Sequence, residues 1–314
     1  QPNLRVIIDP ALLHVSHLRV RDYLRMPWIL NSSLTRRRLL WSAAAAITAR
    51  AAAPAETRWA LVSDIHVPAD PENTYRGFKP FENFKAVVPQ IVKANPDGVV
   101  ISGDLARLEG LPGDYQALRA LLAPLVEKTP VALALGNHDD RKNFLAAFGE
   151  LLKDRRQPAA GRQVLVVEKP PVRWVVLDSS IQVSYGAGLL GKAQRAWLET
   201  YLAAADSTPT LLVVHHPPDD ADGNLHDSDR LLRMVAPHRQ VKAIVYGHSH
   251  VYRYSVEQGI HLVNLLATGY NFNDREPVGW VEARFTPSGG EFTLRALAGN
   301  REQDGKAVRL EWRG

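Results

Sequence analysis

Five short motifs built from Gly, Asp, Asn and His could form a metal centre, and each directly follows an apolar run. Short aliphatic and β-branched runs that end at Gly or Asp are typical of parallel strands buried on both faces. In open α/β sheets, ligands gather at the carboxyl ends of such strands. We therefore expect the motifs to converge on one site. They are Asp64-Ile65-His66, Gly103-Asp104, Gly136-Asn137-His138-Asp139, His215-His216 and Gly247-His248-Ser249-His250.

The donor atoms of these motifs suit Mn, Fe, Zn or Co, because carboxylate and amide oxygens are mixed with imidazole nitrogens. The chain has no cysteine, so no thiolate is available. Residues two apart in an extended segment face the same side, which predicts that Asp64 and His66 reach one ion. The same spacing predicts that His248 and His250 enter one cavity. Asp104 is expected to bridge two ions that lie about 3.5–4 Å apart and clamp a phosphate.

A structural interpretation also exists for each motif, since a single Asp or His at a strand end is commonly a turn former or a satisfied polar group. The number of histidines in the motifs favours the metal centre. Six of the nine histidines after residue 55 belong to them. These are His66, His138, His215, His216, His248 and His250.

The order of the motifs resembles that of the calcineurin-like metallophosphoesterase superfamily, over about residues 58 to 272. The resemblance implies two divalent or mixed-valence metal ions, drawn from Mn, Fe, Zn or Co, in a four-layer α/β/β/α fold. The ligands that it implies are Asp64, His66, Asp104 and His250 for the first ion, and Asp104, Asn137, His215 and His248 for the second.

Differences from some branches of the superfamily indicate which branch the sequence resembles more. The protein Ser/Thr phosphatases extend the second motif to Gly-Asp-x-x-Asp-Arg-Gly, which residues 103–109 do not match. The purple acid phosphatases carry a Tyr ligand where Arg107 stands here. The sequence is more similar to the bacterial cyclic-nucleotide and glycerophosphodiester phosphodiesterases, which tend to have a Thr-Gly pair after the last motif, here Thr268-Gly269.

The resemblance also implies a mechanism, in which a metal-bridging hydroxide attacks phosphorus in line with the leaving alkoxide. His138 would lie near the phosphate and stabilise the developing charge or protonate the leaving oxygen. Asp139 has two interpretations: it orients the imidazole of His138, or it caps the following helix, which is slightly favoured.

Four residues are candidates for substrate contacts. An arginine at position 107 or 76 could clamp a phosphate oxygen through paired hydrogen bonds. The other two are His216, which stands beside the ligand His215, and Tyr270, in a loop expected near the metals, although a structural role for His216 is favoured. Loop residues of this kind are more often merely solvated, so the loops do not identify a substrate.

The remaining chain predicts an α/β fold in which two sheets form a sandwich flanked by helices. Apolar residues at spacings of three and four predict helices over residues 81–94, 115–127, 144–152, 194–204 and 228–235. Late strands are expected over residues 251–256, 260–266, 278–285 and 291–296, where they would complete the second sheet.

Residues 1–55 are expected to be an upstream extension followed by a signal peptide, with the catalytic domain over residues 56–314. Adjacent arginines at 36–38 precede a short apolar stretch and a small-residue end, a pattern typical of twin-arginine export. The apolar stretch is too short to span a bilayer, so no stable membrane insertion is expected. The expected partner is the twin-arginine export machinery and the expected location is the periplasm. An amphipathic helix with a basic start is the alternative, and Met26 would be a sensible start.

Charge argues against a nucleic-acid surface. Residues 1–55 hold eight of the 38 basic and two of the 33 acidic residues, so residues 56–314 are nearly neutral. We therefore expect an exported binuclear-metal enzyme that hydrolyses a small phosphodiester or phosphomonoester. A nuclease with the same metal centre is the alternative, and a non-catalytic metal-binding scaffold is a third possibility. Oligomeric state is left open.

Overall fold

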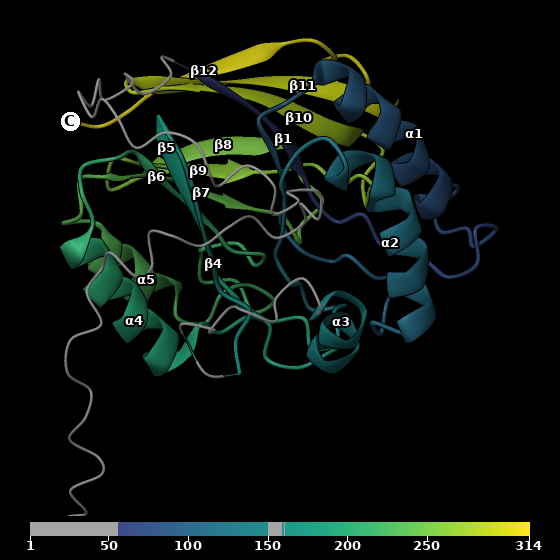
Figure 1. Cartoon of the computed structure of the whole chain (residues 1–314), viewed down its shortest axis with the longest axis horizontal. Coiled ribbons are helices and arrows are strands. Elements are labelled where there is room, and N and C mark those ends of the chain that lie inside the picture. Colours follow the sequence, from purple (N-terminus) through teal and green to yellow (C-terminus); the bar gives the residue numbers. More distant parts are fainter. Residues whose placement is uncertain (1–55, 150–158, 160) are drawn as a thin grey trace, which may run out of the picture.

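Two six-stranded sheets pack face to face in the computed structural model, which describes residues 56–149, 159 and 161–314 (Figure 1). The first sheet has the order β12-β11-β10-β1-β2-β3, and the second has the order β4-β5-β6-β7-β9-β8. The strands of the first sheet are β1 (Thr57–Val62), β2 (Gly98–Ile101), β3 (Val131–Leu133), β10 (Pro277–Thr286), β11 (Gly289–Gly299) and β12 (Ala307–Glu311). Those of the second are β4 (Leu165–Lys169), β5 (Val172–Val176), β6 (Thr210–Val213), β7 (Val241–Tyr246), β8 (Arg253–Glu257) and β9 (Ile260–Asn264).

Helices cover the outer faces of both sheets, which confirms the four-layer fold. In Figure 1, α1 and α2 lie on the side of the first sheet, and α4 and α5 lie on the side of the second. Between the sheets, the ring of Trp174 lies 5.1 Å from Trp59 and 5.5 Å from Phe285. The helices are α1 (Pro80–Ala94), α2 (Pro112–Val126), α3 (Arg141–Phe148), α4 (Gly191–Ala204) and α5 (Ser228–Val235).

Parallel pairing brings the ends of the motif-bearing strands together. Strands β1, β2 and β3 run parallel to one another in the first sheet, as do β5, β6, β7 and β9 in the second. All five expected strands before the motifs are present as β1, β2, β3, β6 and β7. Their carboxyl ends carry the five motifs, so the predicted convergence has a structural basis.

The placement of the late strands differs from the prediction. Strands β10 and β11 join the first sheet, where β10 pairs antiparallel with β1, and only β8 and β9 complete the second sheet. Strands β4, β5 and β12 were not expected from the sequence. The helix expected over residues 144–152 is α3, which ends at Phe148, and residues 150–158 lie outside the described residues. The predictions for residues 1–55 also lie outside them.

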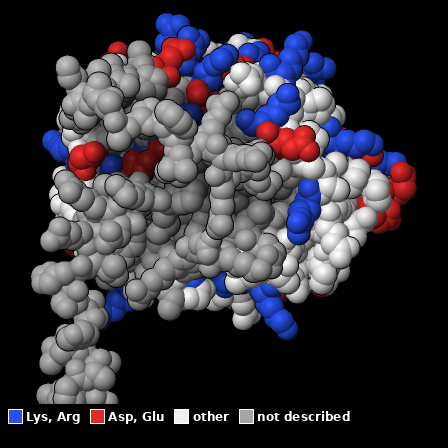
Figure 2. Space-filling view, viewed as in Figure 1, with Lys and Arg blue, Asp and Glu red and all other residues white. Residues whose placement is uncertain are grey.

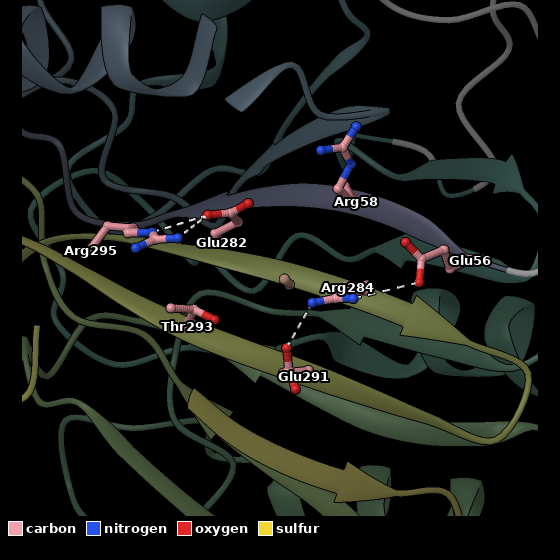
Figure 3. A pocket seen from close by; sticks show the side chains of 8 residues that line it. Glu56, Arg58, Glu282, Arg284, Glu291, Thr293 and Arg295 are labelled. Atoms are coloured by element: carbon pink, nitrogen blue, oxygen red, sulfur yellow. Dashed lines mark hydrogen bonds and ion pairs between the residues drawn. The ribbon is translucent and has the colours of Figure 1, made fainter. Parts of the chain in front are cut away.

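Part of the outer face of the first sheet, over β1, β10 and β11, has a hollow lined by charged side chains (Figure 3). Arg284 lies opposite Glu291 in the register and contacts it at 3.0 Å, while Arg295 contacts Glu282 at 2.6 Å. Exposed ion pairs of this kind contribute only about 0–1 kcal/mol each. These charged side chains face the solvent, and the apolar side chains on the other face of each strand pack in the core.

Among the described residues, no helix combines the length and apolarity needed to span a bilayer.

Candidate metal centre

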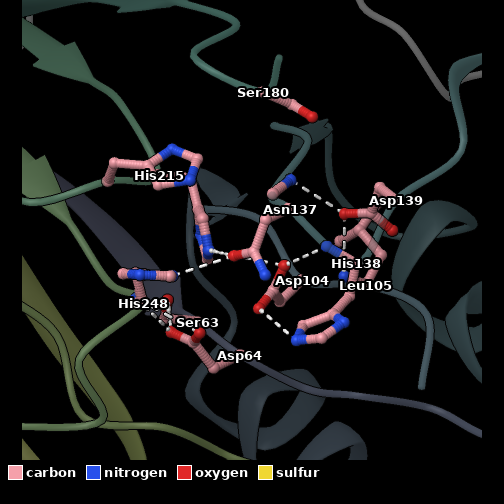
Figure 4. Close-up of polar contacts among 12 residues, drawn as sticks. Ser63, Asp64, Asp104, Leu105, Asn137, His138, Asp139, Ser180, His215 and His248 are labelled. Carbon is pink, nitrogen blue, oxygen red and sulfur yellow. Dashed lines mark hydrogen bonds and ion pairs between the residues drawn. The ribbon is translucent and has the colours of Figure 1, made fainter. Parts of the chain in front are cut away.

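The seven predicted metal ligands lie together at the carboxyl ends of the strands. Figure 4 shows five of them, which are Asp64, Asp104, Asn137, His215 and His248. Three overlapping groups of carboxylates and imidazoles have ligand atoms within 4.8 Å of one another. Asn137 joins them, since its Oδ1 lies 2.8 Å from His248 Nδ1 and 3.2 Å from His215 Nε2. The groups are Asp64, His66 and His250; His66, Asp104 and His138; and Asp104, His215 and His248.

Asp104 occupies the centre of this cluster, and its two oxygens face different histidines. Oδ1 lies 3.4 Å from His215 Nε2, whereas Oδ2 lies 3.7 Å from His66 Nε2. We call the side with Asp64, His66 and His250 the first position and the side with Asn137, His215 and His248 the second position. This division of the carboxylate suits a ligand shared by two cations.

Backbone carbonyls fix which nitrogen three of the four histidine ligands present to the cluster. His66 Nδ1 lies 3.1 Å from Arg107 O, His215 Nδ1 lies 3.1 Å from Ser102 O, and His250 Nδ1 lies 2.6 Å from Tyr270 O. Each Nδ1–H donates to its carbonyl, which leaves Nε2 facing the cluster. Metal-binding histidines almost always have such a partner on the other nitrogen.

Two of these nitrogens lie close together at the first position. His66 Nε2 and His250 Nε2 lie 3.2 Å apart. Burial lowers the pKa of His66 to about 3, so its ring is neutral at pH 7 and can act as a ligand. Both histidines have a ligand atom within 4.8 Å of a carboxylate oxygen of Asp64, which places three potential ligands around one position.

Buried negative charge in the cluster also favours a bound cation. Burial alone would raise the pKa of Asp104, but the charges and hydrogen bonds of the histidines around it, His215 first, outweigh burial and hold that pKa well below its usual range. Burial opposes ionisation of Asp64 as well, but His250 outweighs it and lowers that pKa. Burial lowers the pKa of His215, but Asp104 outweighs it and raises that pKa to about 9. Buried carboxylates that stay ionised need cationic partners.

The backbone at the ligands is left-handed rather than extended. Asp64, His66, Asp104, His248 and His250 have φ angles of 49°, 46°, 48°, 67° and 55°. Each costs about 1–3 kcal/mol in a non-glycine residue, and such strain clusters at functional sites. Asp64 and His66 face the cluster together, as do His248 and His250, which agrees with the expectation from the sequence. The extended backbone that was given as the reason was wrong. Each side chain turns inward through a left-handed residue.

His138 lies at the open side of the cluster. Its Nδ1 is 2.7 Å from Leu108 O, and its Nε2 is 4.0 Å from Asp104 Oδ2. The side chain is 23% exposed, in contrast to the buried ligands. Figure 4 shows it on the opposite side of Asp104 from His215 and His248. An imidazole nitrogen in this place can exchange a proton with a group bound at the cluster.

A calcineurin-like phosphoesterase family model matches residues 57–252. The chain belongs to this family. It is a metal-dependent phosphoric ester hydrolase. The matched residues contain all five motifs.

Curated relatives share much of their length with the chain. A probable cyclic nucleotide phosphodiesterase of Synechococcus sp. is 32% identical over 241 residues, which cover 73% of the chain and 88% of the relative. A glycerophosphodiester phosphodiesterase of Enterobacter lignolyticus is 31% identical over 61% of the chain and 70% of the relative. Among solved structures, a dimetal phosphatase of Danio rerio has a TM-score of 0.65 at 16% identity, covering 82% of the chain and 99% of that structure. This last similarity concerns the fold.

The structure gives Asp139 neither of the two expected contacts. The N-cap of α3 is Asp140, whose side chain accepts from Asn143 N, so the capping prediction was wrong. The carboxylate of Asp139 instead accepts from the backbone N–H groups of Gly136, Leu105 and Ala106, and from the hydroxyl of Tyr115. It ties the second motif to the third and has no hydrogen bond with the His138 ring. No pattern in the sequence indicated these partners.

We expect Asp139→Ala to lower the free energy of unfolding by about 3 kcal/mol or more, because each unsatisfied buried donor costs about 1–3 kcal/mol. Chemical denaturation of the metal-loaded protein measures this change. Asp140→Ala is the matched control, since loss of the helix cap costs about 1 kcal/mol. Equal unfolding free energies in the two variants, with a lower kcat only in Asp139→Ala, would instead support a catalytic role.

Tyr270 and His216, two candidate substrate contacts, lie behind the ligands and are buried. The ring of Tyr270 lies 4.7 Å from His66 and 4.8 Å from His250. The ring of His216 lies 5.0 Å from His215 and 4.8 Å from His248. One buried ring therefore packs on both histidines of the first position, and another packs on both histidines of the second. These contacts favour the structural interpretation of His216 and extend it to Tyr270.

The two candidate arginines lie at the edge of the first position. Arg107 donates from Nε to Asn73 Oδ1 at 3.0 Å, and its guanidinium lies over the ring of Tyr75 at 4.9 Å. Its Nη1 is buried and has no hydrogen-bond partner among the described residues. Arg76 is exposed and donates to Phe272 O at 2.8 Å. Both arginines thus hold loops beside the ligands.

Two serines at the cluster were missed in the sequence. Ser63 donates its hydroxyl to Asp64 Oδ2, and Ser102 Oγ lies 2.6 Å from Ser63 Oγ. Ser102 also supplies the carbonyl that accepts from His215. Both serines directly follow strands β1 and β2. Their position between an apolar run and an acidic motif was a signal that could have revealed them.

Proposed function

We propose that the chain is an exported phosphoesterase that uses two metal ions to hydrolyse a small phosphodiester or phosphomonoester. The observation that carries the proposal is the division of Asp104 between two sets of histidine nitrogens. The first ion would be held by Asp64, His66, Asp104 and His250, and the second by Asp104, Asn137, His215 and His248. Imidazole and oxygen donors fit Mn, Fe, Zn or Co, in divalent or mixed-valence pairs.

Bound ions supply an activated water and neutralise charge on the phosphate. The side chains of the protein supply the negative charge, the ligating nitrogens and the proton donor. Asp104 and Asp64 place buried negative charge under the ions, while the carbonyls of Arg107, Ser102 and Tyr270 keep the imidazoles in their ligating tautomer. His138 presents Nε2 to the open side, where it donates a proton to the leaving oxygen.

His138→Gln is expected to lower kcat by about 100- to 1,000-fold for a diester with an alkyl leaving group, since an alkoxide leaves slowly without a proton. The loss should be much smaller for bis(p-nitrophenyl) phosphate, whose leaving group is stable as an anion. Steady-state kinetics on the two substrates, at equal metal content, measure the difference. Equal losses on both substrates would show that His138 does not protonate the leaving group.

The names of the relatives and the surface charge support a small substrate. The relatives are named a probable cyclic nucleotide phosphodiesterase and a glycerophosphodiester phosphodiesterase, and both names denote small diesters. On the part of this face that is not drawn in grey, Figure 2 shows Lys and Arg interspersed with Asp and Glu, as expected for a chain whose residues 56–314 are nearly neutral. Nucleic acid needs a basic stripe of one sign. A nuclease and a scaffold remain the rivals to be tested.

A panel of phosphoesters assayed after reconstitution with Mn, Fe, Zn or Co tests the proposal. We expect turnover of bis(p-nitrophenyl) phosphate that disappears with chelation and returns with metal. Faster degradation of single-stranded or plasmid DNA would favour the nuclease. Bound metal without turnover of any ester would favour the scaffold.

Export rests on residues 36–55 of the sequence, which lie outside the described residues. Residues 26–55 fused to a reporter should carry it to the periplasm through the twin-arginine route. Replacing Arg37 and Arg38 by Lys should leave the reporter in the cytoplasm. A reporter that is never exported, or that is exported equally by both fusions, would contradict this route.

A further inference from the structure

Two exposed aromatic rings border the first metal position. The ring of Phe272 stacks on that of His250, with centroids 4.3 Å apart and planes inclined by 29°, and the residue is 49% exposed. Tyr75 is 40% exposed, and its ring meets that of Tyr270 edge-on at 4.7 Å. Tyr270 joins the two, since its ring also lies 5.6 Å from Phe272. We call Tyr75 and Phe272 the aromatic platform.

Hydrogen bonds and a cation hold the platform in place. Arg76 donates to the carbonyl of Phe272 at 2.8 Å and so ties the loop of Tyr75 to that of Phe272. Tyr75 and Phe78 exchange two backbone hydrogen bonds of 2.9 Å. The Arg107 guanidinium lies over the Tyr75 ring. A platform ordered before binding loses little conformational entropy when a ligand stacks on it.

The position of the platform relative to His138 determines which part of a substrate it can meet. Phe272 stacks on His250, whose ring lies 5.2 Å from that of His66, which in turn lies 5.3 Å from that of His138. The leaving oxygen lies at His138 if that residue protonates it. The other ester arm, which the phosphate retains, is then the one next to Phe272.

From this arrangement, and resting on the proposed function, we infer that Tyr75 and Phe272 select phosphodiesters whose retained arm carries an aryl or heteroaromatic ring. A flat ring gains stacking on exposed aromatic side chains, whereas a glycerol-like arm does not. Arg76 and Arg107 place positive charge next to the rings, which complements the anionic diester. The platform therefore favours a diester whose retained arm carries a flat ring over one whose retained arm is glycerol-like.

Phenyl p-nitrophenyl phosphate and ethyl p-nitrophenyl phosphate test this inference, because they share a leaving group and differ only in the retained arm. The natural chain should have a KM about 5- to 50-fold lower for the phenyl ester. Phe272→Ala should bring the two KM values to within about twofold of each other, and Phe272→Trp should keep the preference. Val256→Ala is the control, since Val256 is 58% exposed and lies on β8.

Calorimetric binding of phenylphosphonate and ethylphosphonate to the metal-loaded protein gives a readout that needs no turnover. Preference for phenylphosphonate that Phe272→Ala removes would support the platform even if no ester were hydrolysed, a result that would count against the proposed function alone. Equal KM values and equal affinities for the two arms in the natural chain would overturn the platform. So would an unchanged preference in Phe272→Ala.

Discussion

Asp104→Asn is expected to remove metal binding and hydrolysis together. The carboxylate presents Oδ1 to His215 and Oδ2 to His66, and an amide can offer only one neutral oxygen in its place. The ions supply several kcal/mol of transition-state stabilisation, so kcat/KM should fall by about a thousandfold or more. The backbone N–H of His138 also donates to Oδ1 at 2.9 Å, so the change disturbs the proton donor as well.

Elemental analysis and steady-state kinetics on the same preparation measure both losses. Asp220→Asn is the control, since it makes the same chemical change at an exposed position. Circular dichroism of the apo proteins shows whether the variant folds. Turnover and metal content close to those of the natural chain would refute a shared ligand at Asp104.

Gly136→Ala is expected to have the next largest effect, although it adds only a methyl group. A Cβ at this position would lie 2.2 Å from Asp104 Oδ1 and 2.8 Å from His215 Nε2, which no packing tolerates. The loop cannot easily retreat, because the Gly136 N–H donates to Asp139 at 2.9 Å. Asp104 must move instead. We expect about 1–3 kcal/mol of destabilisation from overpacking, and metal affinity reduced about 10- to 100-fold, as for displaced groups that support ligands.

Thermal unfolding with and without metal, together with metal titration, measures these two effects. Gly223→Ala is the matched control, because its Cβ would meet nothing within 4 Å. Normal metal affinity in Gly136→Ala would mean that the cluster can open around Asp104 without loss. That outcome would contradict the rigid arrangement described above.

The convergence of the motifs could be predicted from the sequence because it depends on strand ends. Parallel strands place their carboxyl ends on one edge, so polar residues that follow apolar runs must meet there. The same rule predicted β1, β2, β3, β6 and β7. It could not assign β10 and β11 to a sheet, since pairing of distant antiparallel strands is set by tertiary packing rather than by local pattern.

The local backbone geometry and the hydrogen bonds at the site could not be predicted from residue types. Asp64 and His66 turn inward through left-handed φ angles, which non-glycine residues rarely adopt and no local pattern indicates. Asp139 binds backbone donors from two loops, and those loops lie more than 30 residues apart in the chain. Tyr270 was a candidate substrate contact because its loop was expected to lie near the metals. Its burial against His66 depends on the folded loops alone.

The most direct test of the two-ion centre is a crystal structure of the metal-loaded protein with anomalous diffraction measured at the absorption edge of the metal. We predict two anomalous peaks about 3.5–4 Å apart, with Asp104 contacting both and His66, His250, His215 and His248 completing the two sites. A single peak away from Asp104, or no peak after soaking in divalent ions, would contradict the account.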